Sequence, residues 1–222
     1  MKKTAIFYYL TSFKNIILNF NFGSIFFLLF NKKTIIKIKK FSFICRNLMD
    51  VWTVKEVVYD HCYEKLKKIK KNDVVIDIGA SIGDFSILAS KKGAKKIYAV
   101  EMDNKAINIM KENIKLNQAK NIFVIQKKLN SLDYLFNQYK IKNCHFLKVD
   151  CEGWEYKIFK NATLKTLKKI NYFAIEIHLF NKKMFKNYLL LKKKLKKAGL
   201  ILKEIDNPVH NYLKFLFAMK KT

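Results

Sequence analysis

A chain of 222 residues, half of them hydrophobic, suits one domain with a sizeable core, and its six Gly and single Pro exclude a disordered or fibrous protein. The net charge of +28 suggests an anionic partner, yet Arg46 is the only arginine among 45 basic residues, and bidentate recognition of phosphate or guanine favours arginine. We therefore attribute the charge mainly to solvated lysine-rich faces and keep a nucleic-acid partner as an alternative.

The first thirty or so residues predict amphipathic helices. They begin like a signal peptide, with two lysines before an apolar stretch, but polar residues interrupt the stretch and no small-residue cleavage site follows. The clean apolar run 25–30 is too short to span a bilayer. We expect these helices to pack on the domain. The alternative is that they lie on an anionic membrane surface, with lysines toward the headgroups.

The four cysteines predict a reducing compartment. Cys45, Cys62, Cys144 and Cys151 form no C-x-x-C pair and have no His at metal-ligand spacing. They are typical of free thiols, which favours a cytoplasmic protein, peripheral to the inner face of the membrane if the N-terminal helices bind lipid.

The remaining elements follow in chain order. Residues 34–43 alternate partly, as one or two short strands do, and residues 50–70 have helical spacing. From residue 71 strands and helices alternate. The predicted strands are 74–78, 96–100, 122–125, 144–149 and 172–177, and the predicted helices include 84–92, 104–116 and 182–197. Two final strands, 200–204 and 212–219, have no helix between them.

This alternation predicts a Rossmann-like α/β fold. The sheet should be mainly parallel and seven-stranded, with helices on both faces and the last two strands as an antiparallel pair at the edge. We place this domain at residues 51–222 and treat residues 1–50 as an appendage of helices and short strands.

The most informative stretch is VVIDIGASIGDFS at residues 74–86, which places Gly79 and Gly83 between a strand and a helix. In an open α/β sheet, ligands bind beyond the carboxyl ends of the strands, and glycine lets the backbone approach them. The G-x-x-x-G spacing differs from the G-x-G-x-x-G that brings a helix N-terminus to a pyrophosphate. We therefore predict S-adenosylmethionine, which has no phosphate, as the cofactor.

Five residues are predicted to bind this cofactor. Asp77 would fix the ammonium side, directly or through water. The loop that contains Gly79, Ala80 and Gly83 would pass under the methionine chain. Glu101 ends the next strand, roughly 20 residues past the glycines, where a carboxylate can accept both ribose hydroxyls. The alternative is a nucleotide-binding or non-catalytic Rossmann-like domain.

The segment from Asp50 to about Phe180 resembles the FkbM-type methyltransferases. The opening DVWTVKE, the glycine motif, YAVE with KENIKLN, and the strand IEIH all match, and FLKVDCEGWE at residues 146–155 resembles the signature K-I-D-x-E-G-x-E. The resemblance implies a class I methyltransferase fold and O-methylation of sugars or other hydroxyl-bearing products. Residues 126–133 are shorter and more basic than the family pattern, so we assign no adenine contact.

The predicted catalytic residues follow two neighbouring strands. Asp150 and Glu152 lie at and just past the end of one strand, and His178 ends the next. Methyl transfer to oxygen requires alignment of the acceptor and removal of a proton, for which carboxylates and His are suited. The sequence leaves open which of the three is the base. The same residues could instead hold a divalent cation; we assign no metal ligand.

The predicted function is O-methylation of a sugar or glycan-linked hydroxyl, with a small-molecule or glycan acceptor. An RNA or DNA methyltransferase, motivated by the charge, and a non-catalytic binding protein are the alternatives. The only proline is Pro208, so Cys151 has no neighbouring Pro and the [DNS]-P-P-[YFW] loop of many base-modifying enzymes is absent. Both features weaken the nucleic-acid alternative.

Overall fold

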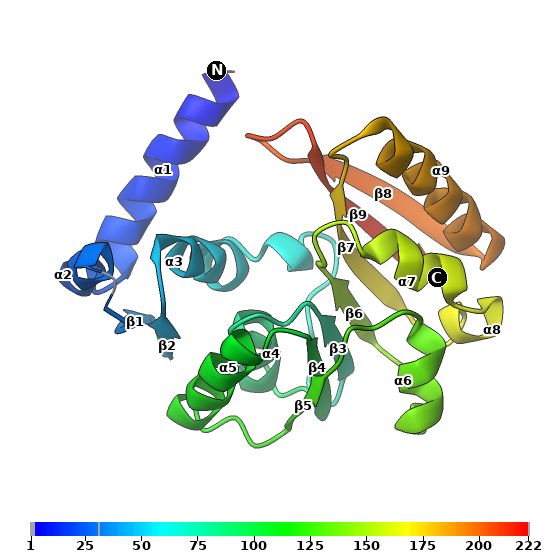
Figure 1. Cartoon of the computed structure of the whole chain (residues 1–222), viewed down its shortest axis with the longest axis horizontal. Coiled ribbons are helices and arrows are strands. Elements are labelled where there is room, and N and C mark those ends of the chain that lie inside the picture. Colours follow the sequence, from blue (N-terminus) through cyan, green and yellow to red (C-terminus); the bar gives the residue numbers. More distant parts are fainter. Residues whose placement is uncertain (1–2, 31, 222) are drawn as a thin grey trace.

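A seven-stranded sheet forms the centre of the computed structural model, which describes residues 3–30 and 32–221 (Figure 1). The strands are β3 (Val74–Ile78), β4 (Lys96–Glu101), β5 (Ile122–Gln126), β6 (Phe146–Val149), β7 (Tyr172–His178), β8 (Leu200–Asp206) and β9 (Leu213–Lys220). Their order is β5-β4-β3-β6-β7-β9-β8. Strands β3 to β7 run parallel, and β9 pairs antiparallel with both β7 and β8. The predicted mixed sheet with an antiparallel edge pair is confirmed.

Helices cover both faces of this sheet, because side chains of a strand alternate between the two faces. The helices are α4 (Asp84–Lys91), α5 (Asn104–Leu116), α6 (Leu132–Gln138), α7 (Glu155–Asn161), α8 (Leu164–Leu167) and α9 (Lys182–Lys197). Val75 and Phe146 join a core cluster with residues of α4 and α5. Their neighbours Ile76 and Leu147 join a second cluster with residues of α6, α7 and α9.

The segment before the sheet differs from its prediction. The expected helix over 50–70 is instead α3 (Leu48–Val54), a π-helical turn η2 (Lys55–Tyr59) and a 3₁₀ turn η3 (Cys62–Glu64). His61 interrupts the helix with a left-handed backbone (φ 52°). The buried carboxylate of Glu64 then accepts the Ile69 N–H at 2.8 Å and so replaces a helical hydrogen bond. The apolar periodicity beyond residue 60 reflects a buried irregular segment.

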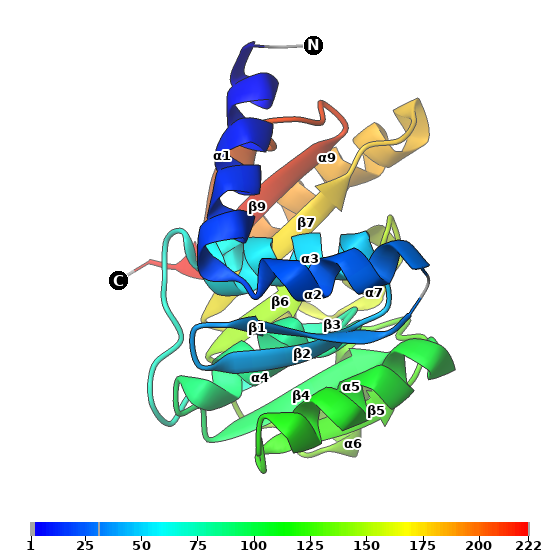
Figure 2. The ribbon, with the colours of Figure 1, turned by 90° about the vertical axis from the view of Figure 1, so that its left-hand side faces the viewer.

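The N-terminal segment contains both predicted element types. It consists of α1 (Lys3–Asn19), α2 (Phe22–Ile25), the 3₁₀ helix η1 (Phe26–Phe30) and a hairpin of β1 (Thr34–Ile38) and β2 (Phe41–Cys45). Figure 2 shows α1, α2 and the hairpin on one side of the domain. Within residues 3–30 and 32–221, no helix has the length and apolar character needed to cross a membrane.

Two buried asparagines of α5 attach the hairpin to the domain. Asn113 accepts the Ile44 N–H at 2.6 Å and donates to the carbonyl groups of Ile82 (3.0 Å) and Ile44 (3.3 Å). Asn117 accepts from Ser42 N at 3.2 Å and donates to its carbonyl at 2.6 Å. The hairpin edge that faces α5 is therefore satisfied by side chains rather than by another strand.

Asn113→Ala should lower the free energy of unfolding by about 1–3 kcal/mol, because it leaves buried backbone groups without partners. Denaturant unfolding measures the change. Lys111→Ala, at an exposed position of the same helix, should alter stability by less than about 0.5 kcal/mol. Equal effects of the two substitutions would show that the asparagine does not anchor the hairpin.

Candidate active site

The glycine loop between β3 and α4 is tied to the ends of two neighbouring strands. Gly79 N and Ala80 N both donate to the carbonyl of Val100, at 2.9 and 3.0 Å. Gly79 has a left-handed backbone (φ 74°), and a Cβ there would lie 1.7 Å from the carbonyl oxygen of Asp150. Only glycine allows this approach. The predicted cofactor loop and the first predicted catalytic residue are therefore in direct contact.

Glu101 lies at the end of β4, beside this loop. Its Oε1 accepts the N–H groups of Met102 (2.7 Å) and Asp103 (2.9 Å), and its Oε2 accepts that of Ser81 (2.9 Å). The carboxylate is partly exposed and keeps an unused lone pair on Oε2. An anchored acid with spare acceptor capacity fits a ribose diol, so the residues present fit the predicted cofactor. Gly83 (φ 88°) is the N-cap of α4.

Asp77 lies deeper than its predicted role suggests. It is fully buried, accepts from Ser86 Oγ at 2.7 Å and faces Lys148 Nζ at 3.2 Å. Lys148 Nζ also donates to the carbonyl of Gly79 at 2.7 Å. The structure brings Asp77 to a buried lysine, so a contact with the cofactor ammonium stays a prediction and would require water.

The buried charges beside Asp77 shift one another. Burial alone would lower the pKa of Lys148, but the carboxylates of Asp77, Asp150 and Asp84 outweigh burial and raise that pKa. Burial raises the pKa of Asp84 to about 7, although Lys148 opposes the increase. Lys148 therefore stays charged and compensates the acids that underlie the glycine loop.

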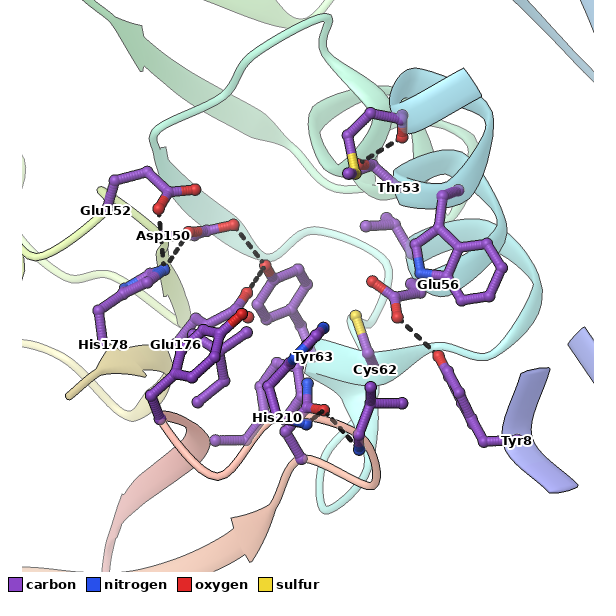
Figure 3. A pocket seen from close by; sticks show the side chains of 18 of the residues that line it. Tyr8, Thr53, Glu56, Cys62, Tyr63, Asp150, Glu152, Glu176, His178 and His210 are labelled. Atoms are coloured by element: carbon purple, nitrogen blue, oxygen red, sulfur yellow. Dashed lines mark hydrogen bonds and ion pairs between the residues drawn. The ribbon is translucent and has the colours of Figure 1, made fainter. Parts of the chain in front are cut away.

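The three predicted catalytic residues lie together. His178 Nε2 is 3.4 Å from Glu152 Oε2 and 3.9 Å from Asp150 Oδ1, and one ligand atom from each residue falls within 4.8 Å of the others (Figure 3). Glu152 adopts a left-handed backbone (φ 52°), followed by Gly153 in the same region (φ 94°). This tight turn directs the exposed Glu152 carboxylate toward His178, and strain of this kind is concentrated at functional sites.

Glu155, the first residue of α7, holds His178 from the other side. Its buried carboxylate accepts from Gly153 N (2.9 Å) and His178 N (3.1 Å), and its Oε1 lies 3.4 Å from His178 Nδ1. Burial would lower the pKa of His178, but Glu155, Asp150 and Glu152 outweigh it and raise the pKa to about 9. In the free protein His178 is therefore protonated at neutral pH, which makes it a poor base.

Two further residues, Tyr63 and Glu176, belong to the cluster and were not among the predicted catalytic residues. Tyr63 Oη lies 2.9 Å from Asp150 Oδ2 and 3.0 Å from Glu176 Oε2. Burial, with the charge of Asp150, raises the pKa of Glu176 to about 8. Glu176 was visible in the sequence as the acid in IEIH, whereas no local pattern marked Tyr63, which arrives from η3.

A cavity of about 630 Å³ opens from this cluster toward α1 and α3 (Figure 3). Its lining includes seven aromatic residues: Tyr8, Tyr9, Trp52, Tyr63, Phe180, Tyr212 and Phe215. It also includes four acids: Glu56, Asp150, Glu152 and Glu176. None of its described lining residues is Lys or Arg, although these make up 45 of 222 residues in the chain. We call it the acceptor cavity, and Asp150 links it to the glycine loop.

Two family models match the chain. The TRM5/TYW2 methyltransferase domain matches residues 45–150, and the methyltransferase FkbM domain matches residues 107–202. The chain belongs to the S-adenosylmethionine-dependent methyltransferases. The FkbM resemblance is thereby confirmed, and S-adenosylmethionine is the cofactor.

Three similar proteins illustrate the relationship. The tRNA (guanine(37)-N(1))-methyltransferase Trm5b of Methanocaldococcus jannaschii is 51% identical over 53 residues, 24% of this chain and 15% of that protein. The ribosomal protein L11 methyltransferase of Anoxybacillus flavithermus is 36% identical over 78 residues, 35% of this chain and 25% of that protein. The Streptococcus mutans protein SMU.1697c, in complex with SAH, has a TM-score of 0.57 and 17% identity over 75% of this chain and 97% of its own.

These similarities are limited in extent. The chain spans a quarter or less of the length of these two curated relatives, and the structural similarity, at 17% identity, supports the fold. The matched segments correspond to a methyltransferase domain and not to the relatives' whole proteins. The methyl acceptor has to be inferred from the acceptor cavity itself.

NMR titration should show the imidazole of His178 titrating near pH 9. The His178→Gln spectrum, which lacks this resonance, identifies it among the four histidines. Glu155→Gln removes the adjacent buried charge and should lower the His178 pKa. Because the folded pKa exceeds the unfolded value of about 6.5, this group stabilises the fold fully below pH 6.5, and the contribution is lost as the pH rises through 9. Titration near 6.5 in the folded protein would contradict the assignment.

Proposed function

We propose that this methyltransferase methylates a hydroxyl of a sugar or glycan-linked acceptor that binds in the acceptor cavity. The observation that carries the proposal is the composition of the cavity, which is aromatic and acidic and has no Lys or Arg among its described lining residues. Asp150 connects it to the glycine loop of the cofactor.

This composition favours a neutral, hydroxyl-rich acceptor. Carboxylates accept hydrogen bonds from several hydroxyl groups, and aromatic rings offer apolar faces for the C–H groups of a sugar ring. A phosphorylated acceptor would instead meet the carboxylates of Asp150 and Glu152, and His178 would be the one positively charged side chain among the described lining residues. His178, although protonated, is already surrounded by three carboxylates.

The residues of the site divide the chemistry between them. When bound, S-adenosylmethionine supplies an activated methyl group that passes to a nucleophilic oxygen. Asp150 accepts the proton of the acceptor hydroxyl, because its carboxylate lies at the junction of the glycine loop and the cavity. His178, held by Glu155, keeps the Asp150 carboxylate oriented, and Tyr63 contacts its other oxygen.

A nucleic-acid acceptor remains the second candidate. It is favoured by the net charge of +28 and by the match to the TRM5/TYW2 domain, since the similar Trm5b protein is named as a tRNA methyltransferase. The charge, however, is spread over lysines outside the cavity wall. A nucleic acid would have to insert an uncharged base or ribose among the carboxylates while its phosphates stayed outside.

Calorimetric titration should show that the folded protein binds S-adenosylmethionine and that Glu101→Ala weakens this affinity at least about tenfold, because hydrogen bonds to a charged group are lost. Glu112→Ala, at an exposed position of the neighbouring helix, should bind like the wild type. Unchanged affinity in Glu101→Ala would remove the ribose assignment, and no binding by the folded wild type would leave a Rossmann-like binding module.

Transfer of labelled methyl groups should occur to neutral or amino-bearing glycosides and not to sugar phosphates or tRNA. Asp150→Asn should lower kcat by about 10²–10⁴ without loss of cofactor affinity, because the acceptor proton loses its base. Glu112→Gln serves as the matched control.

EDTA should leave the wild-type rate unchanged, because the proposed reaction uses the Asp150 carboxylate as the base and needs no metal ion. A requirement for Mg²⁺ would instead make Asp150, Glu152 and His178 a cation site. Salt-sensitive methylation of tRNA would favour the second candidate.

A further inference from the structure

Helix α1 packs on the domain through the buried apolar side chains of Ala5 and Ile16 and through several polar contacts. Tyr8 Oη donates to Glu56 Oε1 at 2.6 Å, and the buried Ser12 accepts from Lys55 Nζ at 2.6 Å. Lys55 is itself buried, pairs with Asp60 at 2.6 Å and lies over the Tyr8 ring. Hydrogen bonds and ion pairs that involve Tyr8, Ser12 and Lys55 therefore anchor this helix from within.

The outward face of the same helix is apolar. Phe7, Leu10 and Leu18 are 65–70% exposed, and Ile6, Phe13 and Ile17 are 42–56% exposed. A helix on the surface of a water-soluble domain normally shows the opposite pattern, with its apolar stripe toward the core. Water is therefore an unfavourable environment for this face.

The apolar surface continues beyond α1 into the next two helical segments. The rings of Phe13 and Phe22 are in contact, with centroids 6.1 Å apart. The 3₁₀ helix η1 adds four large side chains that are 53–60% exposed: Phe26, Phe27, Leu29 and Phe30. Figure 2 shows α1 and the α2–η1 segment on the same side of the domain. We call this surface, formed by residues 6–30, the N-terminal apolar face.

The charged residues within the N-terminal apolar face and directly beside it in the sequence are all basic. Asp50 is the first acidic residue of the chain, and nine basic residues precede it. Lys14 lies within the N-terminal apolar face, and Lys32 and Lys33, both exposed, follow it directly. An isologous contact between two copies would bring two acid-free basic segments together, which their mutual repulsion disfavours. An anionic bilayer offers both an apolar interior and the opposite charge.

We infer that the N-terminal apolar face docks in the plane of an anionic lipid bilayer. The helices lie on the membrane, since none of the described ones is long and apolar enough to cross it. Exposed large apolar side chains enter the headgroup boundary, and the flanking lysines meet the lipid phosphates.

Docking would also orient the acceptor cavity. Tyr8 and Tyr9 of α1 line the cavity, next to Phe7 and Leu10 of the docking face. Met49 is 69% exposed and also lines the cavity. The cavity therefore lies beside the membrane surface, within reach of an acceptor carried on a lipid. This last step rests on the proposed function, whereas docking itself does not.

Vesicle flotation tests docking with the full chain and no acceptor. Vesicles of phosphatidylcholine with phosphatidylglycerol are compared with phosphatidylcholine alone. The wild type should float with the anionic vesicles, and Phe7→Ser/Leu10→Ser/Leu18→Ser should reduce the bound fraction at least about tenfold. A matched control, Phe185→Ser/Leu190→Ser/Ile201→Ser, removes three side chains of 50–64% exposure elsewhere and should float like the wild type.

Three outcomes would overturn the inference. The first is that the wild type, shown to be folded by its binding of S-adenosylmethionine, does not float with the anionic vesicles. The second is that the two triple variants float equally, which would show that lysine charge alone binds the vesicles. The third is that sedimentation without lipid shows self-association of the wild type and none of the Phe7/Leu10/Leu18 variant. This result would assign the N-terminal apolar face to contact with a second copy of the chain. Because flotation uses no acceptor, failure to methylate a glycan leaves its result unchanged.

Discussion

The geometry of the site depends on the buried ammonium group of one lysine, Lys148. Lys148 Nζ lies beneath the end of the sheet, where it faces Asp77 and donates to the carbonyl of Gly79. A charge buried at this depth is tolerated only with partners, and here the partners come from β3, the glycine loop and α4. Removal of Lys148 would leave two buried acids, Asp77 and Asp84, uncompensated directly below the cofactor loop. The loop geometry is therefore fixed electrostatically as well as by its glycines.

Asp150 transmits this geometry to the acceptor side. It follows the strand that carries Lys148, its carbonyl fits against Gly79, and its carboxylate contacts Tyr63 and His178. A displacement of the loop would move the proposed base, Asp150, with it. Methyl transfer demands close alignment of acceptor and cofactor, and a single residue shared by the two subsites limits their relative movement.

The sequence predicted the sheet well because buried strands and the glycine motif are local signals. Strand β3 and helices α5 and α9 match their predicted bounds, whereas the short helices α6, α7 and α8 offer too few turns for a periodic pattern. Site chemistry was harder to predict. A histidine was expected to suit the base role from its ordinary pKa, but the surrounding carboxylates, Glu155 above all, are brought together only by folding. Tyr63 lies in the 3₁₀ turn η3, where the apolar periodicity of the sequence predicted a continuous helix.

The net charge of +28 is distributed unevenly over this protein. Four of its seventeen acids line the acceptor cavity, where no described wall residue is Lys or Arg, while the first forty-nine residues hold nine basic side chains and no acid. The two regions are adjacent, since α1 contributes to both. An anionic surface attracted to the N-terminal apolar face would find no lysine or arginine among the described residues of the cavity wall. This separation of charge fits both proposals, since the N-terminal apolar face would meet phosphate headgroups while the cavity beside it would take an uncharged acceptor.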